Sequence, residues 1–164
     1  MKLPFAEKLI KMSTVSENEL NASNIDDIKL ELIHDHNGSL LLADKRLKIV
    51  MLKWNGVIDK ETARELLSKG AENIEFHDYK KLMINRLELV ELETEARIWI
   101  KKFLQGRAKR IAPKVNKVAF VNPKSVRGSI FSNMLSSAIS LIIPTLKTQK
   151  FITEAEASQW LLAI

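Results

Sequence analysis

The sequence predicts an α/β fold: a mixed β-sheet that starts with a β-meander and continues as alternating helices and strands. Two extended segments flank Asn37-Gly38, the strongest short hairpin signal. Short apolar segments then alternate with amphipathic ones from Asp59 onward. A chain of 164 residues, 46% of them hydrophobic, can bury one core. We therefore expect a single α/β domain over residues 28–164, and a loosely ordered arm or short helix over residues 1–27.

The meander accounts for the first three strands. Residues 28–34 alternate apolar and polar side chains for most of their length, and residues 39–43 follow the hairpin turn as their partner. After the polar turn 44–46, residues 47–54 predict a third strand, which Asn55-Gly56 ends.

Helices and strands alternate in the middle of the chain. Asp59 is placed as the N-cap of a first helix, and residues 81–85 predict a buried strand. A second helix follows, with apolar residues at steps of three and four. It fades near Gly106 or continues weakly toward Pro113.

The last third of the chain repeats this alternation. Residues 117–121 predict a strand, and the segment 128–146 predicts a core helix with one polar face. A short edge strand precedes Thr153, which forms a capping box with Glu156 and so marks the start of a final helix.

Charge is the most uneven property of the sequence. Residues 96–153 contain twelve Lys and Arg and no acid, while the whole chain has a net charge of +6. A basic segment of this kind attracts acidic proteins, phosphate-bearing partners or anionic membrane surfaces, and a solvated helix face is the alternative. The candidate basic interaction surface consists of Lys101, Lys102, Arg107, Lys109, Arg110, Lys114 and Lys117.

Sequence-specific binding to nucleic acids is not expected from this basic segment. Proteins that bind single strands interleave basic residues with exposed aromatic side chains. Trp99 and Phe103 instead fall on the apolar stripe of the predicted helix, where they belong to the core.

We expect no catalytic residue and no cofactor. The chain has no cysteine, which excludes thiolate catalysis, and its five glycines are isolated, which argues against a phosphate-binding loop. Glu88, Glu91, Glu93 and Glu95 lie at or near a predicted helix start, where the helix dipole favours acids. We interpret them as solvated side chains.

The three histidines are the candidates for metal ligands. His34 and His36 lie on one side of an extended strand, and His77, distant in the sequence, would be the third ligand. Because the first two flank Asp35 and immediately precede the hairpin turn, we interpret them as polar hairpin-end residues and expect no metal site.

We expect a cytoplasmic protein. Charged residues interrupt the first apolar residues before a secretory leader could form, and no later apolar run approaches membrane-spanning length. The absence of cysteine suits a reducing compartment.

The order of elements resembles a STAS-like domain, and more narrowly the small bacterial SpoIIAA-like proteins common in Bacteroidetes. The similar segments are residues 49–56, which end in Trp54-Asn55-Gly56, and residues 81–86, 117–123 and 151–161. The resemblance implies a mixed sheet with helices packed against it. It also implies a protein-binding switch that is controlled by phosphorylation of a serine after a central strand.

This sequence departs from that pattern. The corresponding strand is residues 81–85, and residues 86–91 after it contain neither serine nor threonine. Thr94 is the nearest hydroxyl and therefore the candidate phospho-acceptor, with a capping or surface threonine as the alternative.

Two functions follow as expectations. The first is a non-enzymatic regulatory or protein-interaction domain that engages an acidic partner through the basic surface. The alternative is a module that binds a small molecule or lipid in a pocket lined by Met83, Met134 and residues 141–143, although core packing explains those residues equally well.

Overall fold

The structure is a computed structural model, and it describes residues 28–164 apart from the side chains of Phe131 and Ser132. The predicted arm over residues 1–27 lies outside the described residues. The division of the chain into an arm and one domain therefore stays a prediction.

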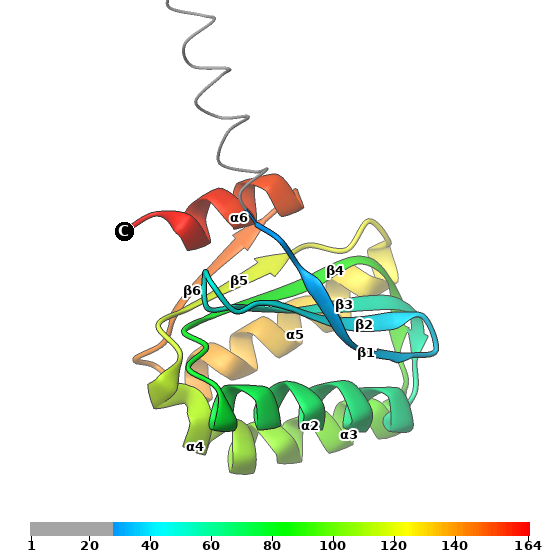
Figure 1. Cartoon of the computed structure of the whole chain (residues 1–164). Coiled ribbons are helices and arrows are strands. Elements are labelled where there is room, and N and C mark those ends of the chain that lie inside the picture. The colour runs from blue at the N-terminus through cyan, green and yellow to red at the C-terminus, as the bar shows by residue number, and fades with distance from the viewer. Residues whose placement is uncertain (1–27) are drawn as a thin grey trace, which may run out of the picture.

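A six-stranded mixed sheet forms the centre of the molecule, with the strands in the order β1 to β6 (Figure 1). Strands β1 to β3 pair antiparallel, and β3 to β6 pair parallel. This arrangement confirms the predicted fold class of a mixed sheet that begins with a meander and continues with alternating helices and strands. The bounds are β1 (Glu31–His36), β2 (Ser39–Asp44), β3 (Ile49–Ile58), β4 (Lys81–Leu92), β5 (Lys117–Val121) and β6 (Lys147–Phe151).

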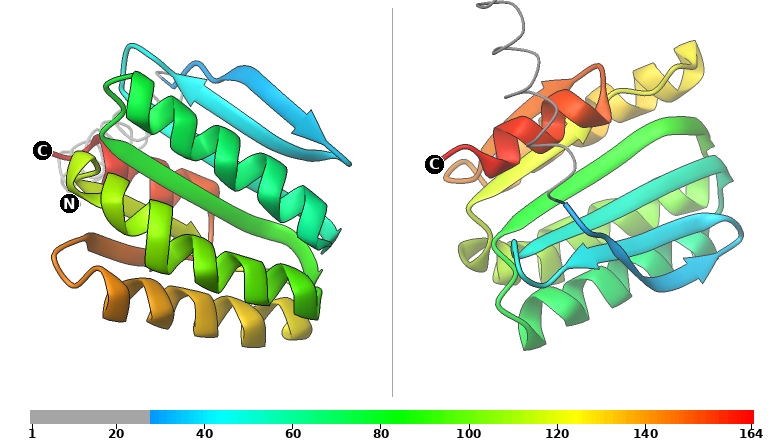
Figure 2. Two further views of the ribbon diagram at one scale, coloured as in Figure 1. Left: turned by 90° about the horizontal axis from the view of Figure 1, so that it is seen from below. Right: turned by 45° about the horizontal axis from the view of Figure 1, so that its top comes forward.

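Three helices cover one face of the sheet, and one helix covers part of the other face (Figures 1 and 2). The first three are α2 (Lys60–Phe76), α3 (Thr94–Phe103) and α5 (Val126–Ile142), and the fourth is α6 (Glu154–Leu162). Each crossover joins neighbouring strands in the same direction, so right-handed connections place α2, α3 and α5 on one side. Among residues 28–164, no helix has the length and apolar character to cross a membrane.

The second predicted helix continues beyond α3. A π-helical segment (Leu104–Ala108), the short helix α4 (Lys109–Ile111) and a 3₁₀ turn (Ala112–Lys114) extend it. Of the two endings that the sequence left open, continuation toward Pro113 is therefore correct.

Local signals in the sequence set several of these boundaries. Asn37 and Gly38 have φ angles of 52° and 80°, as the tight hairpin turn requires. Asp59 caps α2 by accepting a hydrogen bond from the backbone N–H of Thr62 at 2.7 Å. Thr153 and Glu156 form the predicted capping box of α6.

Strands β3 and β4 are longer than the sequence predicts. β3 does not end at Asn55-Gly56 but shifts register there and continues to Ile58, with Gly56 at a φ of 75°. A glycine of this conformation serves a bulge as well as a turn. The added length of β3 gives β4 a partner up to Leu92, so Glu88 and Glu91 lie on a strand. Glu91 is still near the start of α3 at Thr94, as predicted, whereas Glu88 is a full six residues before it.

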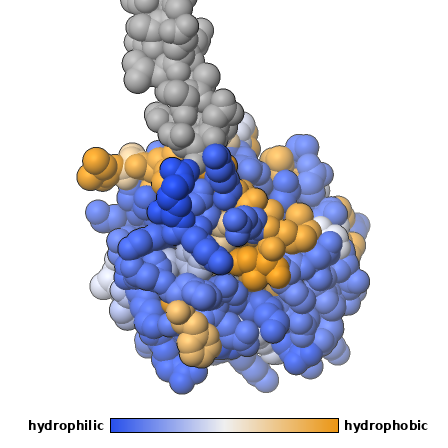
Figure 3. Space-filling model, in the orientation of Figure 1, coloured by the Kyte–Doolittle hydropathy of each residue, from blue (hydrophilic) through white to orange (hydrophobic). Residues whose placement is uncertain are grey.

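The core lies on both faces of the sheet. Leu52, Trp54 and Phe120 belong to the larger cluster beneath the three helices, and Met83 and Leu161 to the smaller cluster beneath α6. The surface in Figure 3 is mostly hydrophilic and carries a hydrophobic patch near the middle of the view. The larger cluster lies beneath α3 and α5, the two helices that form the candidate site.

Candidate interaction groove

The structure separates the seven predicted basic residues into two groups. Arg107, Lys114 and Lys117 form the first group, and each is bonded to another part of the fold. Lys101, Lys102, Lys109 and Arg110 form the second, and all four are exposed. Within residues 28–164, no hydrogen bond or ion pair joins a side chain of this second group to the rest of the fold.

The first group binds the carboxyl ends of two helices. Arg107 donates to both carboxylate oxygens of Glu75 in the last turn of α2, at 3.3 and 2.9 Å, and this contact holds the pKa of Glu75 below its ordinary value. Lys114 donates to the backbone carbonyl of Glu75 at 2.9 Å. Lys117 donates to the carbonyls of Trp160 and Ala163 at the end of α6. Cations are favoured at such ends by the helix dipole.

A groove of about 330 Å³ separates α3 from α5. These two helices lie side by side on the lower face of the sheet, as the left view of Figure 2 shows. Leu92, Ile100 and Leu104 are buried residues that line the groove. Its walls also include the outward-facing residues Ile98 of α3, which is 54% exposed, and Met134 of α5, which is 63% exposed.

The composition of α5 explains why this groove is apolar. Residues 128–146 contain no charged side chain, so the outward face of the helix is built from serines, asparagine and aliphatic residues. Val126, Ile130, Met134 and Leu141 are all exposed. The prediction of a core helix with one polar face is therefore wrong for Ile130 and Met134, while Ser136 is buried.

Ser136 is buried because it contacts an arginine from the sheet. Arg86 of β4 is 1% exposed and donates to the hydroxyl of Ser136 at 3.1 Å and to the carbonyl of Val121 at 3.3 Å. Its guanidinium lies 4.9 Å from the centre of the Phe120 ring, and burial lowers its pKa to about 10. This arginine fixes the inner side of α5 and so leaves the apolar residues on the outer side.

The charge along the groove has one sign. Among the described residues that line it, only Arg97 and Lys101 are charged. Thr94 stands at the start of α3 on the same lining, is exposed, and accepts a hydrogen bond from Arg97 at 2.9 Å. A ligand with an apolar face and acidic flanks matches these walls.

Sequence reasoning found Lys101 but missed the groove. Lys102, its neighbour, lines a different hollow together with Trp99. The available signal was a helix without charge from Gly128 onward, whose apolar residues are not confined to one face, because such a helix leaves apolar side chains on its outer side. Trp99 and Phe103 are partly buried and stack at 5.3 Å, which confirms that they pack against the core.

The residues predicted to line a ligand pocket do not meet. Met83 is fully buried beneath α6, on the opposite face of the sheet from Met134. A separate apolar cavity of about 80 Å³ lies within the larger cluster and includes Ile143 and Phe103 in its lining. Its volume is well below the several hundred Å³ of typical ligand sites.

Comparisons with known proteins give a likeness of fold. No protein-family model matches the chain, and no curated protein matches its sequence. The chain is similar in structure to SiaC of Pseudomonas aeruginosa, with a TM-score of 0.46 and 13% identity, over 76% of this chain and 100% of that chain. At this level the likeness carries no functional argument, and the STAS-like and SpoIIAA-like assignment stays a resemblance of fold.

Proposed function

We propose that this chain is a non-enzymatic protein-interaction domain, and that the groove between α3 and α5 receives an amphipathic helix with acidic flanks from a partner protein. One observation carries the proposal: the walls of a groove of about 330 Å³ are apolar, and the only charges among its described lining residues are the cations Arg97 and Lys101. Helices that dock in grooves bury one apolar face in the same manner.

The exposed aliphatic residues support this mode of binding. Ile98 and Met134, on opposite walls of the groove, leave apolar area in contact with water, which costs about 25 cal/mol for each Å². A docked helix would cover that area with residues spaced at i, i+3, i+4 and i+7. Its acidic side chains would then lie against Arg97 and Lys101, with Lys102, Lys109 and Arg110 adding attraction at longer range.

The sheet topology supports a role without catalysis. In open α/β sheets, ligands bind in the crevice that forms where the strand order reverses. The order β1 to β6 runs in one direction within the described chain, so it contains no such reversal. The predicted lack of catalytic residues and cofactors remains a prediction, as does the cytoplasmic location.

The small-molecule alternative has less support. Met83 and Met134, two of its expected lining residues, lie on opposite faces of the sheet, and the apolar cavity of about 80 Å³ is far smaller than a site for a lipid or cofactor. We therefore favour the protein partner.

Thr94 remains the candidate phospho-acceptor in this account. A phosphate on its exposed hydroxyl would stand beside Arg97, on the lining of the groove. It would neutralise one of the two cations that an acidic helix needs, so phosphorylation would weaken docking.

Site-specific crosslinking tests the proposal. A photoreactive amino acid replaces Met134 in the full chain, and the matched control carries it in place of Phe76, an exposed apolar residue at the end of α2. After irradiation in the native cells, mass spectrometry identifies the crosslinked segment. The proposal requires an acidic amphipathic segment of another protein at position 134 and not at position 76. Crosslinks to residues 1–27, to a second copy, or to no protein at all would contradict it.

A further inference from the structure

A second cluster of polar side chains lies at the opposite end of the chain from the basic segment. His34 and His36 of β1 meet Glu65 of α2, and the atoms that could bind a metal ion lie within 4.8 Å of one another. The two imidazole rings are 6.4 Å apart and inclined by 23°. All three residues are partly buried.

The edge strand is built to aim both histidines at α2. Its pairing with β2 shifts register between Leu32 and His34, and such bulges redirect the side chains that follow. Beyond the shift, His34 and His36 alternate normally and therefore share one side of the strand. Leu32, before the shift, is exposed.

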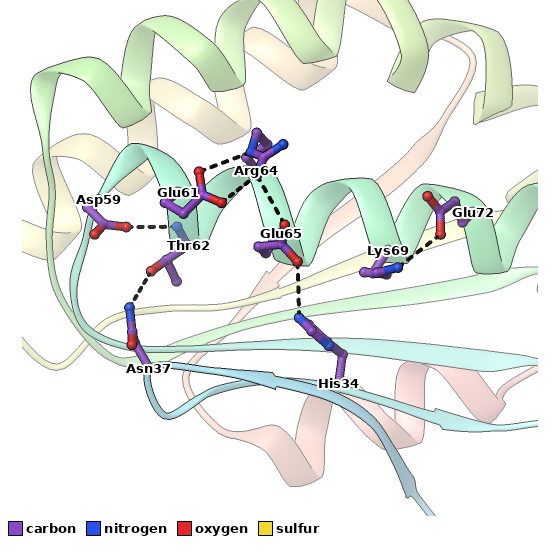
Figure 4. A network of polar contacts seen from close by, with 9 residues as sticks. All are labelled: His34, Asn37, Asp59, Glu61, Thr62, Arg64, Glu65, Lys69 and Glu72. Carbon is purple, nitrogen blue, oxygen red and sulfur yellow. Dashed lines mark hydrogen bonds and ion pairs between the residues drawn. The ribbon is translucent and has the colours of Figure 1, made fainter.

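A hydrogen bond holds the hairpin end against the start of α2. The side chain of Asn37 donates to the hydroxyl of Thr62 at 3.3 Å, and Glu65 follows Thr62 by one helical turn. Figure 4 shows the resulting arrangement, in which His34 reaches toward Glu65 from the strand. The geometry is therefore fixed by backbone elements on both sides.

One atom of the cluster is buried without a hydrogen bond. Nε2 of His34 has no hydrogen-bond partner among the described residues, and the nearest charged atom is Oε2 of Glu65 at 3.4 Å. The other carboxylate oxygen, Oε1, lies 3.3 Å from Arg64, which also binds Glu61. A buried imidazole nitrogen that faces a carboxylate oxygen without a hydrogen bond is an arrangement that a cation bound between the two atoms would satisfy.

The surrounding charge favours a cation. Asp59 lies close to His36, and its pKa is lowered first by the hydrogen bond from Thr62 and to a smaller extent by His36. Glu61 also lies near His36, and its pKa is lowered mainly by Arg64. Arg64 pairs with Glu61 and Glu65, whereas Asp59 accepts its hydrogen bond from the backbone N–H of Thr62, so three carboxylates stand against one arginine here.

We propose that His34, His36 and Glu65 bind a divalent transition-metal ion of the zinc class. Two imidazoles and one carboxylate are donors that Zn²⁺ accepts, at distances near 2.1 Å, so two ligands of one tetrahedral ion lie about 3.4 Å apart. The ligand atoms, which lie within 4.8 Å of one another, would have to approach by up to about 1.4 Å. The ion joins the edge strand to α2 and leaves a fourth coordination position open.

The third histidine provides a control from the same chain. His77 caps the other end of α2 and packs against Tyr79 at 5.9 Å. It follows Glu65 by twelve residues, which corresponds to about 18 Å along a helix. The sequence placed it as a third ligand, whereas the fold supplies Glu65.

Zinc titration of the metal-stripped full chain tests the site. We expect Zn²⁺ to shift the ring NMR signals of His34 and His36 and to leave those of His77 unchanged. Because the ion binds only the folded state, it also raises the thermal midpoint. His36→Gln and Glu65→Gln should each weaken the calorimetric affinity at least about tenfold, while His77→Gln leaves it unchanged.

Several results would overturn the metal site. They are the absence of calorimetric binding, equal shifts of all three histidines, and full affinity in Glu65→Gln. Circular dichroism checks that each variant is folded, and Glu65→Gln tests the site from α2 without a substitution in the edge strand. Since no peptide or partner takes part, the outcome is independent of the proposed groove function.

Discussion

The two groups of basic residues in the segment 96–153 consist of the same residue types, Lys and Arg, but have different surroundings in the fold. Arg107, Lys114 and Lys117 reach carbonyls or a carboxylate at the ends of α2 and α6. Lys101 and Lys109 meet only solvent or the edge of the groove. Density of charge along the sequence therefore does not define a binding surface. The decisive factor is whether the fold brings a helix end within reach of each cation.

Arg86 gives the strongest contrast with the exposed lysines, and its replacement should have the largest effect on stability. Arg86→Met removes the buried hydrogen bonds that Arg86 donates to the hydroxyl of Ser136 and the carbonyl of Val121, so we expect the free energy of unfolding to fall by about 2 kcal/mol in urea titrations. Adding Ser136→Ala should recover part of that loss, because the two side chains act together. A single variant as stable as the parent would show that Arg86 does not support α5.

Charge reversal at position 107 should have the next largest effect. Arg107→Glu replaces a two-point contact with repulsion from Glu75 and should lower the thermal midpoint by several degrees. Lys101→Glu is the matched control and should leave the midpoint unchanged. Equal thermal midpoints for the two variants would contradict the division into basic residues that bind the fold and basic residues that are exposed.

The exposed group should be dispensable for folding. Replacing Lys102, Lys109 and Arg110 together by Glu should change the free energy of unfolding by no more than about 0.5 kcal/mol, as is usual for surface positions. The same variant should bind the acidic partner segment more weakly, and the difference should shrink as salt is added. A large loss of stability would show that these residues support the fold, as Arg107, Lys114 and Lys117 do.

The smallest effect that we expect is on the stability of the protein in acid, and it comes from Asp78, whose ion pairs lie outside residues 96–153. Hydrogen bonds from Lys48 and Lys80 lower the pKa of Asp78 from 3.8 to about 2. Since the folded-state pKa is depressed, the contribution of Asp78 is complete above pH 3.8 and is lost as the pH falls toward about 2. Asp78→Asn should therefore lose less stability than the parent when the pH falls across this interval, as urea titrations at each pH would measure. If both proteins lose the same stability, the ion pairs of Asp78 do not stabilise the fold.

The sequence predicted those features that depend on local signals. The cap at Asp59, the hairpin turn and the capping box at Thr153 each need only a few neighbouring residues, and all three are present. The lengths of β3 and β4 were wrong because each strand depends on its partner, and Gly56 resembles a turn when read alone.

The sites depend on contacts that the sequence does not display. The groove requires Ile98 and Met134, which are 36 positions apart in the sequence, to face each other across two helices. The histidine cluster requires a bulge in β1 and a carboxylate from α2. The pair of histidines was visible in the sequence, but its third member was not.

A charge-swap binding experiment tests the groove most directly. The acidic segment identified by crosslinking is synthesised in its native form and with its acidic flank changed to lysine, and each peptide is titrated into the parent and into Lys101→Glu. Our account predicts that the parent prefers the acidic peptide and that Lys101→Glu prefers the basic one. Equal affinities in all four combinations would contradict recognition of an acidic helix by the α3–α5 groove.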